Sequence, residues 1–292
     1  MAATDRVGIA WRPEIAAGLY LHLDAFDVIE VIADNYFHAT RRELDGLKML
    51  ARHRPMNLHG VGLGLASASA VDRKRLDRIA RLFDAIEPQA WSEHLAFVRA
   101  GGIEIGHLCA PPRTGATSAG TIENIERAAR AVGVTPQMEN IATLIDPPAC
   151  TLNEAEWISG IVAASGVPML LDLHNLYANA CNRGENPLAL LTAMPLDHVT
   201  GVHLSGGKWI DAPSGGRRLL DDHLHEPPDE VLALLTALAR RVPQALTVVI
   251  ERDGNFPAID ELLADVARAR LALAKGRAER ASDHPLSVAL AA

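Results

Sequence analysis

The chain carries little positive charge and contains no run of Lys or Arg. Its 28 Lys and Arg are outnumbered by 36 Asp and Glu, which gives a formal net charge of −8 at pH 7. Proteins that bind nucleic acids through the phosphates need a basic surface. The sequence therefore argues against a nucleic-acid partner, although a metal site can still act on a phosphodiester.

Long apolar runs are also missing. No stretch approaches the roughly 20 apolar residues that span a bilayer, and the opening MAATDRVGIAW lacks the apolar core of a signal peptide. We therefore predict a soluble, cytoplasmic protein without a membrane partner.

Cysteine is scarce, and nucleotide-binding motifs are absent. Cys109, Cys150 and Cys181 are odd in number and widely spaced, which indicates neither a disulfide framework nor a CxxC metal site. We expect the three thiols to be reduced. The GxG at Gly62 and Gly64 lacks the rest of a phosphate-binding or dinucleotide fingerprint.

The chain does contain a repeated βα pattern. Hydrophobic residues make up 49% of the 292 residues and charged residues 22%, which suits a globular domain with a large core. Short apolar runs alternate with longer segments that have apolar residues every three or four positions. We predict eight strands, at residues 7–11, 27–33, 56–63, 90–97, 135–141, 168–175, 198–206 and 246–253.

The segments between these strands read as helices. Asn153 and Glu156 have the spacing of a capping box, and Gly133 and Gly166 follow apolar periodic segments as helix terminators. Eight such units predict an α/β fold, a closed (β/α)8 barrel, rather than an open sheet. We assign residues 1–275 to this single domain and expect residues 276–292 to be a frayed tail.

Polar residues end nearly every predicted strand. In this fold the active site lies at the carboxyl ends of the strands, so these residues should converge on one barrel mouth. One further pair lies between the last two strands. The nine candidate metal ligands are His59, His94, Glu139, Asp172, His174, His203, Asp221, His223 and Glu251.

The spacing and chemistry of these residues favour a catalytic metal site. Asp172 and His174 are two residues apart in a predicted extended run, as are Asp221 and His223 if that segment is extended, so each pair would face one way. Imidazoles and carboxylates without thiolate suit Fe, Mn or Zn in an open site. A single strand-end His is usually structural, but nine converging candidates reverse that expectation.

Other polar residues have weaker support. Glu30 and Asp34 share one face of the second strand and either orient the ring N–H of a ligand or make a structural hydrogen bond. His225 and His107 are weaker candidates still. Gly pairs flank the segment around Trp209, which reads as a flap over the mouth that could touch substrate.

Six strings in order along the chain carry a family resemblance: SEHLAF, MENI, LLDLHNLYANA, GVHLSGG, DDH followed by PPDEV, and VIERDGNFP. With them the sequence resembles the multinuclear non-heme iron-dependent oxidative enzymes, which include the methanobactin biosynthesis enzyme MbnB. The resemblance implies a TIM barrel of the xylose-isomerase-like type. It further implies two or three iron ions, Fe(II) and Fe(III), and O2-dependent oxidation of a residue, often Cys, in a ribosomally made precursor peptide.

The resemblance also implies site residues and partners. The nine candidates above match the ligand positions of the family, although relatives often have Asn where this chain has His174. We predict catalytic roles for Glu139, Asp172, His174, Asp221 and His223. Many relatives work with a partner protein that recognises the peptide's leader, and no appended domain of that kind is visible in this chain.

Two other functions compete with this hypothesis. The same ligand types on a barrel suit a zinc- or manganese-dependent hydrolase or isomerase that resembles a phosphodiesterase. A non-catalytic protein that binds metal or peptide is the other alternative. The native metal distinguishes the iron-dependent oxidation from the zinc- or manganese-dependent alternative, and the sequence does not identify that metal.

Overall fold

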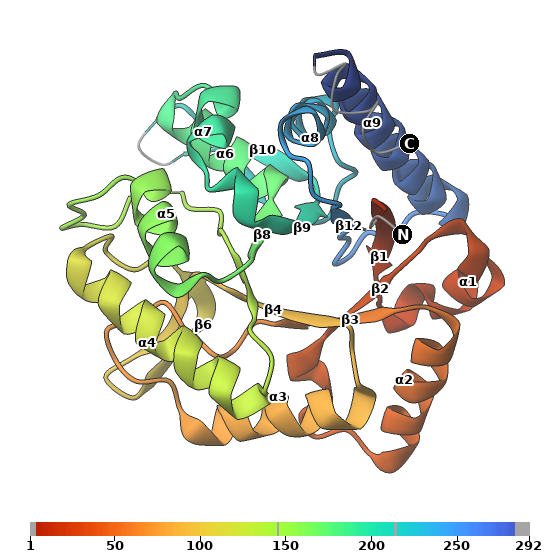
Figure 1. Ribbon diagram of the computed structural model, residues 1–292, viewed down its shortest axis with the longest axis horizontal. Helices are drawn as coiled ribbons and strands as arrows, with labels where there is room; N and C mark the ends of the chain where they lie inside the picture. Colours follow the sequence, from red (N-terminus) through yellow and green to blue (C-terminus); the bar gives the residue numbers. More distant parts are fainter. Residues whose placement is uncertain (1–3, 145, 213–214, 284–292) are drawn as a thin grey trace.

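The computed structural model describes residues 4–144, 146–212 and 215–283. Eight parallel strands close into a barrel, and helices surround it (Figure 1). Their order around the barrel is β1-β12-β9-β8-β7-β4-β3-β2. Because the barrel is closed, this is sequence order when it is followed in the opposite direction from β1 to β2. The barrel strands are β1 (Arg6–Ala10), β2 (Ile29–Ile32), β3 (Met56–Gly60), β4 (Ala90–His94), β7 (Gln137–Glu139), β8 (Met169–Asp172), β9 (Val199–Leu204) and β12 (Thr247–Ile250). The predicted (β/α)8 barrel is confirmed.

The helices pack their apolar faces against the barrel. They are α1 (Ala16–Leu21), α2 (Arg41–His53), α3 (Arg73–Ile86), α4 (Gly115–Val132), α5 (Glu154–Ser165), α6 (Leu173–Arg183), α7 (Pro187–Ala193), α8 (Asp229–Arg241) and α9 (Ile259–Asp283). The capping box of α5 forms as predicted, since Asn153 accepts from the Glu156 N–H. Gly133 and Gly166 end α4 and α5 with positive φ, as expected of helix terminators. None of the described helices is long and apolar enough to cross a bilayer.

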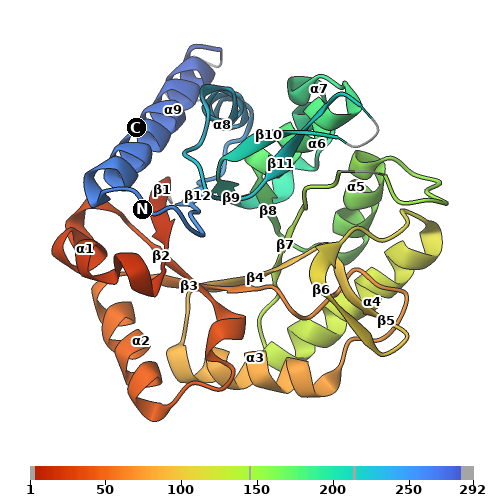
Figure 2. The ribbon, with the colours of Figure 1, turned by 180° about the vertical axis from the view of Figure 1, so that it is seen from behind.

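Two hairpins stand outside the barrel, and the sequence did not predict them as such. The first joins β5 (Phe97–Ala100) to β6 (Ile103–Cys109), and the second joins β10 (Gly207–Asp211) to β11 (Arg217–Asp221). Figure 2 shows the second hairpin beside α6 and α7 and the first beside α4. The second hairpin replaces the loop that we expected around Trp209.

The predicted frayed tail is wrong for residues 276–283. Helix α9 continues to Asp283, and Gly276 is buried against α8, where an added Cβ would lie 2.3 Å from the Thr236 carbonyl oxygen. Arg277 explains the continuation, because its guanidinium forms an ion pair with Asp5 beside β1 and also binds carbonyls at the end of α8. Residues 284–292 of the predicted tail lie outside the described residues.

Candidate metal centre

The strand register places the predicted ligands at one level of the barrel. His94 pairs with Glu139 across β4 and β7, and Asp172 pairs with His203 across β8 and β9. His59 on β3 lies opposite Ser92 on β4. Because all these strands are parallel, their carboxyl ends open at the same end of the barrel. The register thus gathers the side chains that were predicted at separate strand ends.

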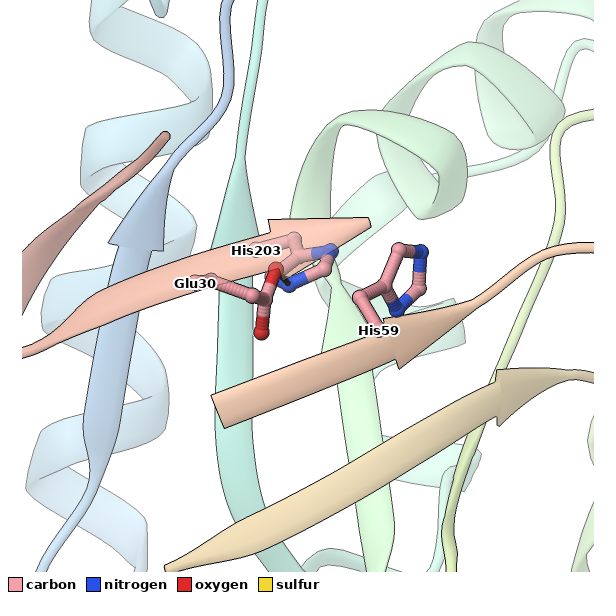
Figure 3. A group of neighbouring side chains, drawn as sticks. All are labelled: Glu30, His59 and His203. Carbon is pink, nitrogen blue, oxygen red and sulfur yellow. Dashed lines mark ion pairs between the residues drawn. The ribbon is translucent and has the colours of Figure 1, made fainter. Parts of the chain in front are cut away.

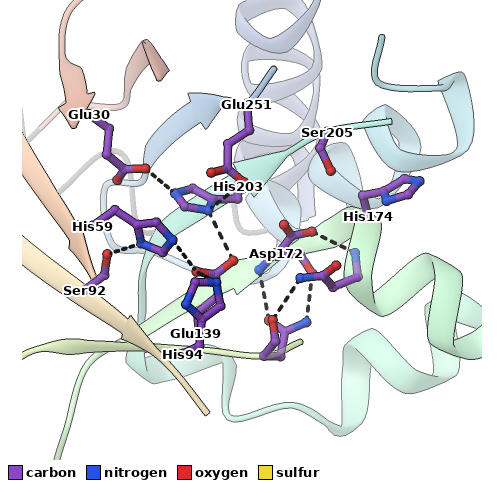
Figure 4. A network of polar contacts seen from close by, with 12 residues as sticks. Glu30, His59, Ser92, His94, Glu139, Asp172, His174, His203, Ser205 and Glu251 are labelled. Atoms are coloured by element: carbon purple, nitrogen blue, oxygen red, sulfur yellow. Dashed lines mark hydrogen bonds and ion pairs between the residues drawn. The ribbon is translucent and has the colours of Figure 1, made fainter. Parts of the chain in front are cut away.

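Glu139 is the centre of the cluster. Its Oε2 lies 3.5 Å from Nε2 of His59 and 3.4 Å from Nε2 of His94. Its Oε1 accepts a hydrogen bond of 3.2 Å from Nδ1 of His203. All four side chains are buried (Figure 4). The two carboxylate oxygens of Glu139 thus contact three imidazoles.

The protein holds the opposite nitrogen of each of these three imidazoles. Nδ1 of His94 donates to the Gly60 carbonyl at 3.1 Å, and Nδ1 of His59 lies 2.7 Å from the Ser92 hydroxyl. Nε2 of His203 lies 2.8 Å from Oε1 of Glu30 (Figure 3). Metal-binding histidines usually have this arrangement, in which one nitrogen is fixed by the protein and the other is offered to the ion. Glu30 therefore lies where a carboxylate that orients a ligand is expected.

Among the residues that the structure describes, three groups of side chains have ligand atoms within 4.8 Å of one another. They are Glu30, His59 and His203; His59, His94 and Glu139; and Glu139, Asp172, His203 and Glu251. Several buried atoms in these groups have no hydrogen-bond partner within the described part of the chain, among them Oε2 of Glu139 and Oδ2 of Asp172. Buried polar atoms without a partner are costly, and a bound cation would satisfy them. The donor set therefore fits a metal cluster.

Asp221 and His223 lie beside these groups. Oδ2 of Asp221 is 3.0 Å from Nε2 of His223, and Nδ1 of His223 is 3.7 Å from Oε2 of Glu251. The two side chains of the predicted pair thus face each other and the cluster, and Asp221 is the last residue of β11. His223 has a positive φ of 54°, so the segment turns directly after the strand.

The predicted extended run from Asp172 to His174 is wrong. Asp172 ends β8 and caps α6, since its side chain accepts from the Asn175 N–H at 2.7 Å. The helix begins at Leu173, which turns His174 away from the side of Asp172. Nδ1 of His174 instead lies 2.6 Å from Oδ1 of Asp221. His174 is in none of the three groups, and its geometry is that of a residue that orients Asp221.

The cluster shifts the pKa values of its members. Burial opposes protonation of His94, but Glu139, Glu93 and Glu251 together outweigh burial and raise the pKa of His94 to about 9. Burial likewise opposes protonation of His203, yet Glu251, Glu30 and Glu139 raise its pKa well above the ordinary value. Burial and then the charge of Asp221 raise the pKa of Asp172. Without a cation, protons on His94, His203 and Asp172 therefore offset the negative charge of the carboxylates in the cluster.

A cavity of about 600 Å³ opens onto the cluster. His59, His94, Glu139, Asp221, His223 and Glu251 line it, while Asp172 and His203 lie deeper. Its walls are largely apolar and come from the two hairpins and the segment between β7 and α5. They include Leu108, Ile141, Leu144, Pro147, Pro148 and Leu219. A substrate in this cavity would thus lie between apolar walls and the cluster.

Sequence reasoning missed Asp253 and Arg12, which also line the cavity. Asp253 lies 3.2 Å from Nδ1 of His223 and is paired with the guanidinium of Arg12. The two residues are 241 positions apart, so no local pattern links them. Asn140 donates to the Asp172 carbonyl and accepts from its N–H.

The two weaker His candidates do not join the ligand groups. His107 lies on β6 and lines the cavity. His225 is 42% exposed at its side chain and hydrogen-bonds through Nδ1 to Asp222 at 2.9 Å. Asp34 accepts from the Val61 N–H at 2.8 Å and thus holds the β3–α3 segment.

Fold and site together define a TIM barrel with a candidate metal centre at the carboxyl ends of its strands. Solved structures of the xylose-isomerase-like type share this fold. D-psicose 3-epimerase has a TM-score of 0.56 and 15% identity, covering 94% of this chain and 99% of that one. A xylose isomerase domain protein from Planctomyces limnophilus has a TM-score of 0.54 and 14% identity, covering 96% and 99%. The predicted fold type is confirmed.

The chain belongs to the family of RiPP precursor modification enzymes MbnB/TglH/ChrH, whose family model matches residues 6–274. A UPF0276 protein of Streptomyces avermitilis is 36% identical over 275 residues, covering 92% of this chain and 55% of that relative. One from Caulobacter vibrioides is 33% identical over 272 residues, covering 92% and 95%. The chain thus spans about half of the first relative and nearly all of the second. The predicted family is confirmed, and its description is that of enzymes that modify the precursor peptides of ribosomally synthesised products.

Proposed function

We propose that this enzyme oxidises a side chain of its precursor peptide, often a cysteine, with O2 and a cluster of two or three iron ions in the Fe(II) and Fe(III) states. The observation that supports the proposal is the arrangement of His59, His94 and His203. Each turns one ring nitrogen toward Glu139, while Ser92, Gly60 or Glu30 holds the other.

The donor chemistry supports iron. The cluster offers imidazole nitrogens and carboxylate oxygens without thiolate, a set that non-heme iron accepts in open sites. The proposed ligands are His59, His94, Glu139, Asp172, His174, His203, Asp221, His223 and Glu251. Among these, the contact of His174 with Asp221 favours a positioning role. Iron, when bound, would supply the site at which O2 is reduced and a substrate thiolate is held.

The protein's own residues control the surroundings of the reacting side chain. The apolar walls of the cavity limit the water around the reacting side chain. Asp221 and His223 line the same cavity, with Oδ2 and Nε2 3.0 Å apart. We propose that this pair positions the reacting side chain beside the cluster, in addition to its part in the cluster. Asp172 and Glu139 contribute to the charge of the cluster next to Asp221 and His223.

Coexpression tests this proposal. The enzyme is produced in iron-replete cells with a short peptide encoded beside it and with a neighbouring protein that could recognise the leader. The peptide's mass is then measured with and without O2. We expect a mass change of the peptide that requires O2 and iron and that increases when the partner is present.

Two results would contradict the proposal. One is equal turnover under strict anaerobiosis, and the other is full activity with zinc as the sole metal. Either result would favour a hydrolase or isomerase on this barrel. His225→Ala serves as the matched control for loss of activity on replacing His223, because His223 lines the cavity, whereas His225 is 42% exposed at its side chain and is not among the lining residues.

A further inference from the structure

The β10–β11 hairpin connects the metal centre to an exposed aromatic and basic pair. In an antiparallel hairpin, directly opposed residues project from the same face. Gly207 is opposite Asp221, Trp209 is opposite Leu219, and Asp211 is opposite Arg217. One face of the hairpin therefore carries Asp221, Leu219, Trp209, Asp211 and Arg217.

This face begins at the cavity and ends in solvent. Asp221 and Leu219 line the cavity, and Leu219 is buried. Farther along the same face, Trp209 is 43% exposed, and the guanidinium carbon of Arg217 lies 5.3 Å from the centre of its ring. Exposed Trp and Arg side chains are the residues most often found at the centres of binding surfaces. Their continuity with the cavity indicates that they serve the same ligand.

The charge of Arg217 is available to a ligand. Among the residues that the structure describes, no carboxylate forms an ion pair with it, including Asp211, its cross-strand neighbour. Inside the cavity, Arg12 is the single Lys or Arg among the described lining residues, and Asp253 neutralises it. Of the described Lys and Arg side chains in the cavity and on this face of the hairpin, Arg217 is therefore the one that can pair with an acidic substrate side chain.

We infer that Trp209 and Arg217 bind an acidic residue of the precursor peptide, about four positions from the residue that is modified. The inference rests on the proposed function, since it takes a peptide as the occupant. Asp221 is four positions after Arg217, which at about 3.3 Å per residue is about 13 Å, the length of four extended peptide residues. Between the acidic position and the modified one, the side chains that face the apolar walls are themselves apolar.

A binding measurement tests the inference without turnover. Zinc-loaded full-length protein is titrated, under reducing conditions, into two fluorescein-labelled peptides, EVTLCLTVE and KVTLCLTVK, and anisotropy is recorded. We expect the Glu peptide to bind about tenfold more tightly than the Lys peptide, since one attraction replaces one repulsion. High salt should reduce this preference.

Three variants locate the contact. Trp209→Ala and Arg217→Ala should each weaken binding of the Glu peptide about fivefold, and Arg217→Glu should reverse the preference. Arg218→Ala is the matched control, because Arg218 lies on the opposite face of the same strand. It should change binding less than about twofold.

The inference is overturned if the two peptides bind equally, if neither binds, or if Arg218→Ala weakens binding as much as Arg217→Ala. These outcomes are separate from failure of the iron chemistry. A protein that retains the Glu preference but never changes the peptide's mass with O2 would contradict the proposed oxidation and leave the binding surface in place.

Discussion

Nε2 of His203 lies 2.8 Å from Oε1 of Glu30, on the side of the ring that faces away from Glu139. Neither of these two atoms has a hydrogen bond, and both are buried. The contact is therefore electrostatic, and the negative charge of Glu30 contributes to the raised pKa of His203. A negative charge behind a ligating imidazole makes it a stronger donor to a cation.

Glu30→Gln should weaken metal binding, because it removes that charge while keeping the size of the side chain. Loss of such supporting groups costs about 10- to 100-fold in metal affinity. Competition with a chromogenic chelator under anaerobic conditions measures the change. Glu14→Gln, on an exposed residue, is the control. Equal affinity in the wild type and Glu30→Gln would show that Glu30 has no role in the site.

His223→Ala should remove at least one of two or three bound ions while the barrel stays folded, because residues at the carboxyl face contribute little to the core. Asp172→Asn should do the same. Asn can still accept from the Asn175 N–H, so the cap of α6 is preserved. His225→Ala should keep every ion.

Metal analysis after anaerobic reconstitution, with circular dichroism for the fold, measures these effects. Wild-type protein that holds one ion or fewer would defeat the cluster hypothesis. Unchanged metal content in both variants would mean that His223 and Asp172 are structural.

The sequence predicted the barrel because apolar strands and periodic helices alternate along the whole chain. It also predicted that Glu139 and its neighbours converge, because the carboxyl ends of all strands in this fold meet at one face of the barrel. The alternation in LLDLHN, by contrast, could not show where strand becomes helix. Asp172 decides that point through its contact with the Asn175 N–H, which an extended reading of the run does not include.

The sequence did not predict the residues that reach the site through contacts between distant segments. Arg12 and Asp253 meet because β1 and β12 are neighbours in the closed barrel, and neither residue belongs to a recognisable local motif. The β5–β6 hairpin did leave a signal, since apolar and other residues alternate in IEIGHL. The predicted strand 90–97 runs past His94, where β4 ends, and includes Phe97, the first residue of the hairpin.

Arg277→Ala should destabilise the fold, which tests the extent of the domain at its carboxyl-terminal side. The guanidinium binds Asp5 through two atoms, at 2.8 and 2.7 Å, and donates to the carbonyls of Ala239 and Gln244. Hydrogen bonds of charged groups contribute about 1.5–3 kcal/mol each, and the bonds of one side chain are not additive, so we expect a loss of about 2–3 kcal/mol. Urea denaturation measures it. Arg280→Ala, which removes a solvent-exposed hydrogen bond to the Arg241 carbonyl, should cost far less; equal effects would contradict the structural role of Arg277.

Asp34 should make the protein less stable as pH rises from about 4 to 6. Burial, and then the charge of Glu93, raise its pKa from 3.8 to about 6, although hydrogen bonds from the Val61 and Gly62 backbone oppose the shift. Between these two values the folded protein keeps a proton that the unfolded chain has lost. The stabilisation is therefore complete below the unfolded pKa and is lost as pH rises through the folded one.

Asp34→Asn removes this titration and keeps an acceptor for the Val61 N–H. Relative to wild type, the variant should gain stability between pH 4 and pH 7, by no more than about 3 kcal/mol for a shift of about two pKa units, and by less because the site is partly solvated. Urea denaturation at both pH values measures the difference. Asp77→Asn, on the exposed side of α3, should follow the wild type at both. If the difference in stability between Asp34→Asn and wild type is the same at pH 4 and pH 7, Asp34 does not titrate in this range, and burial beside Glu93 does not control it.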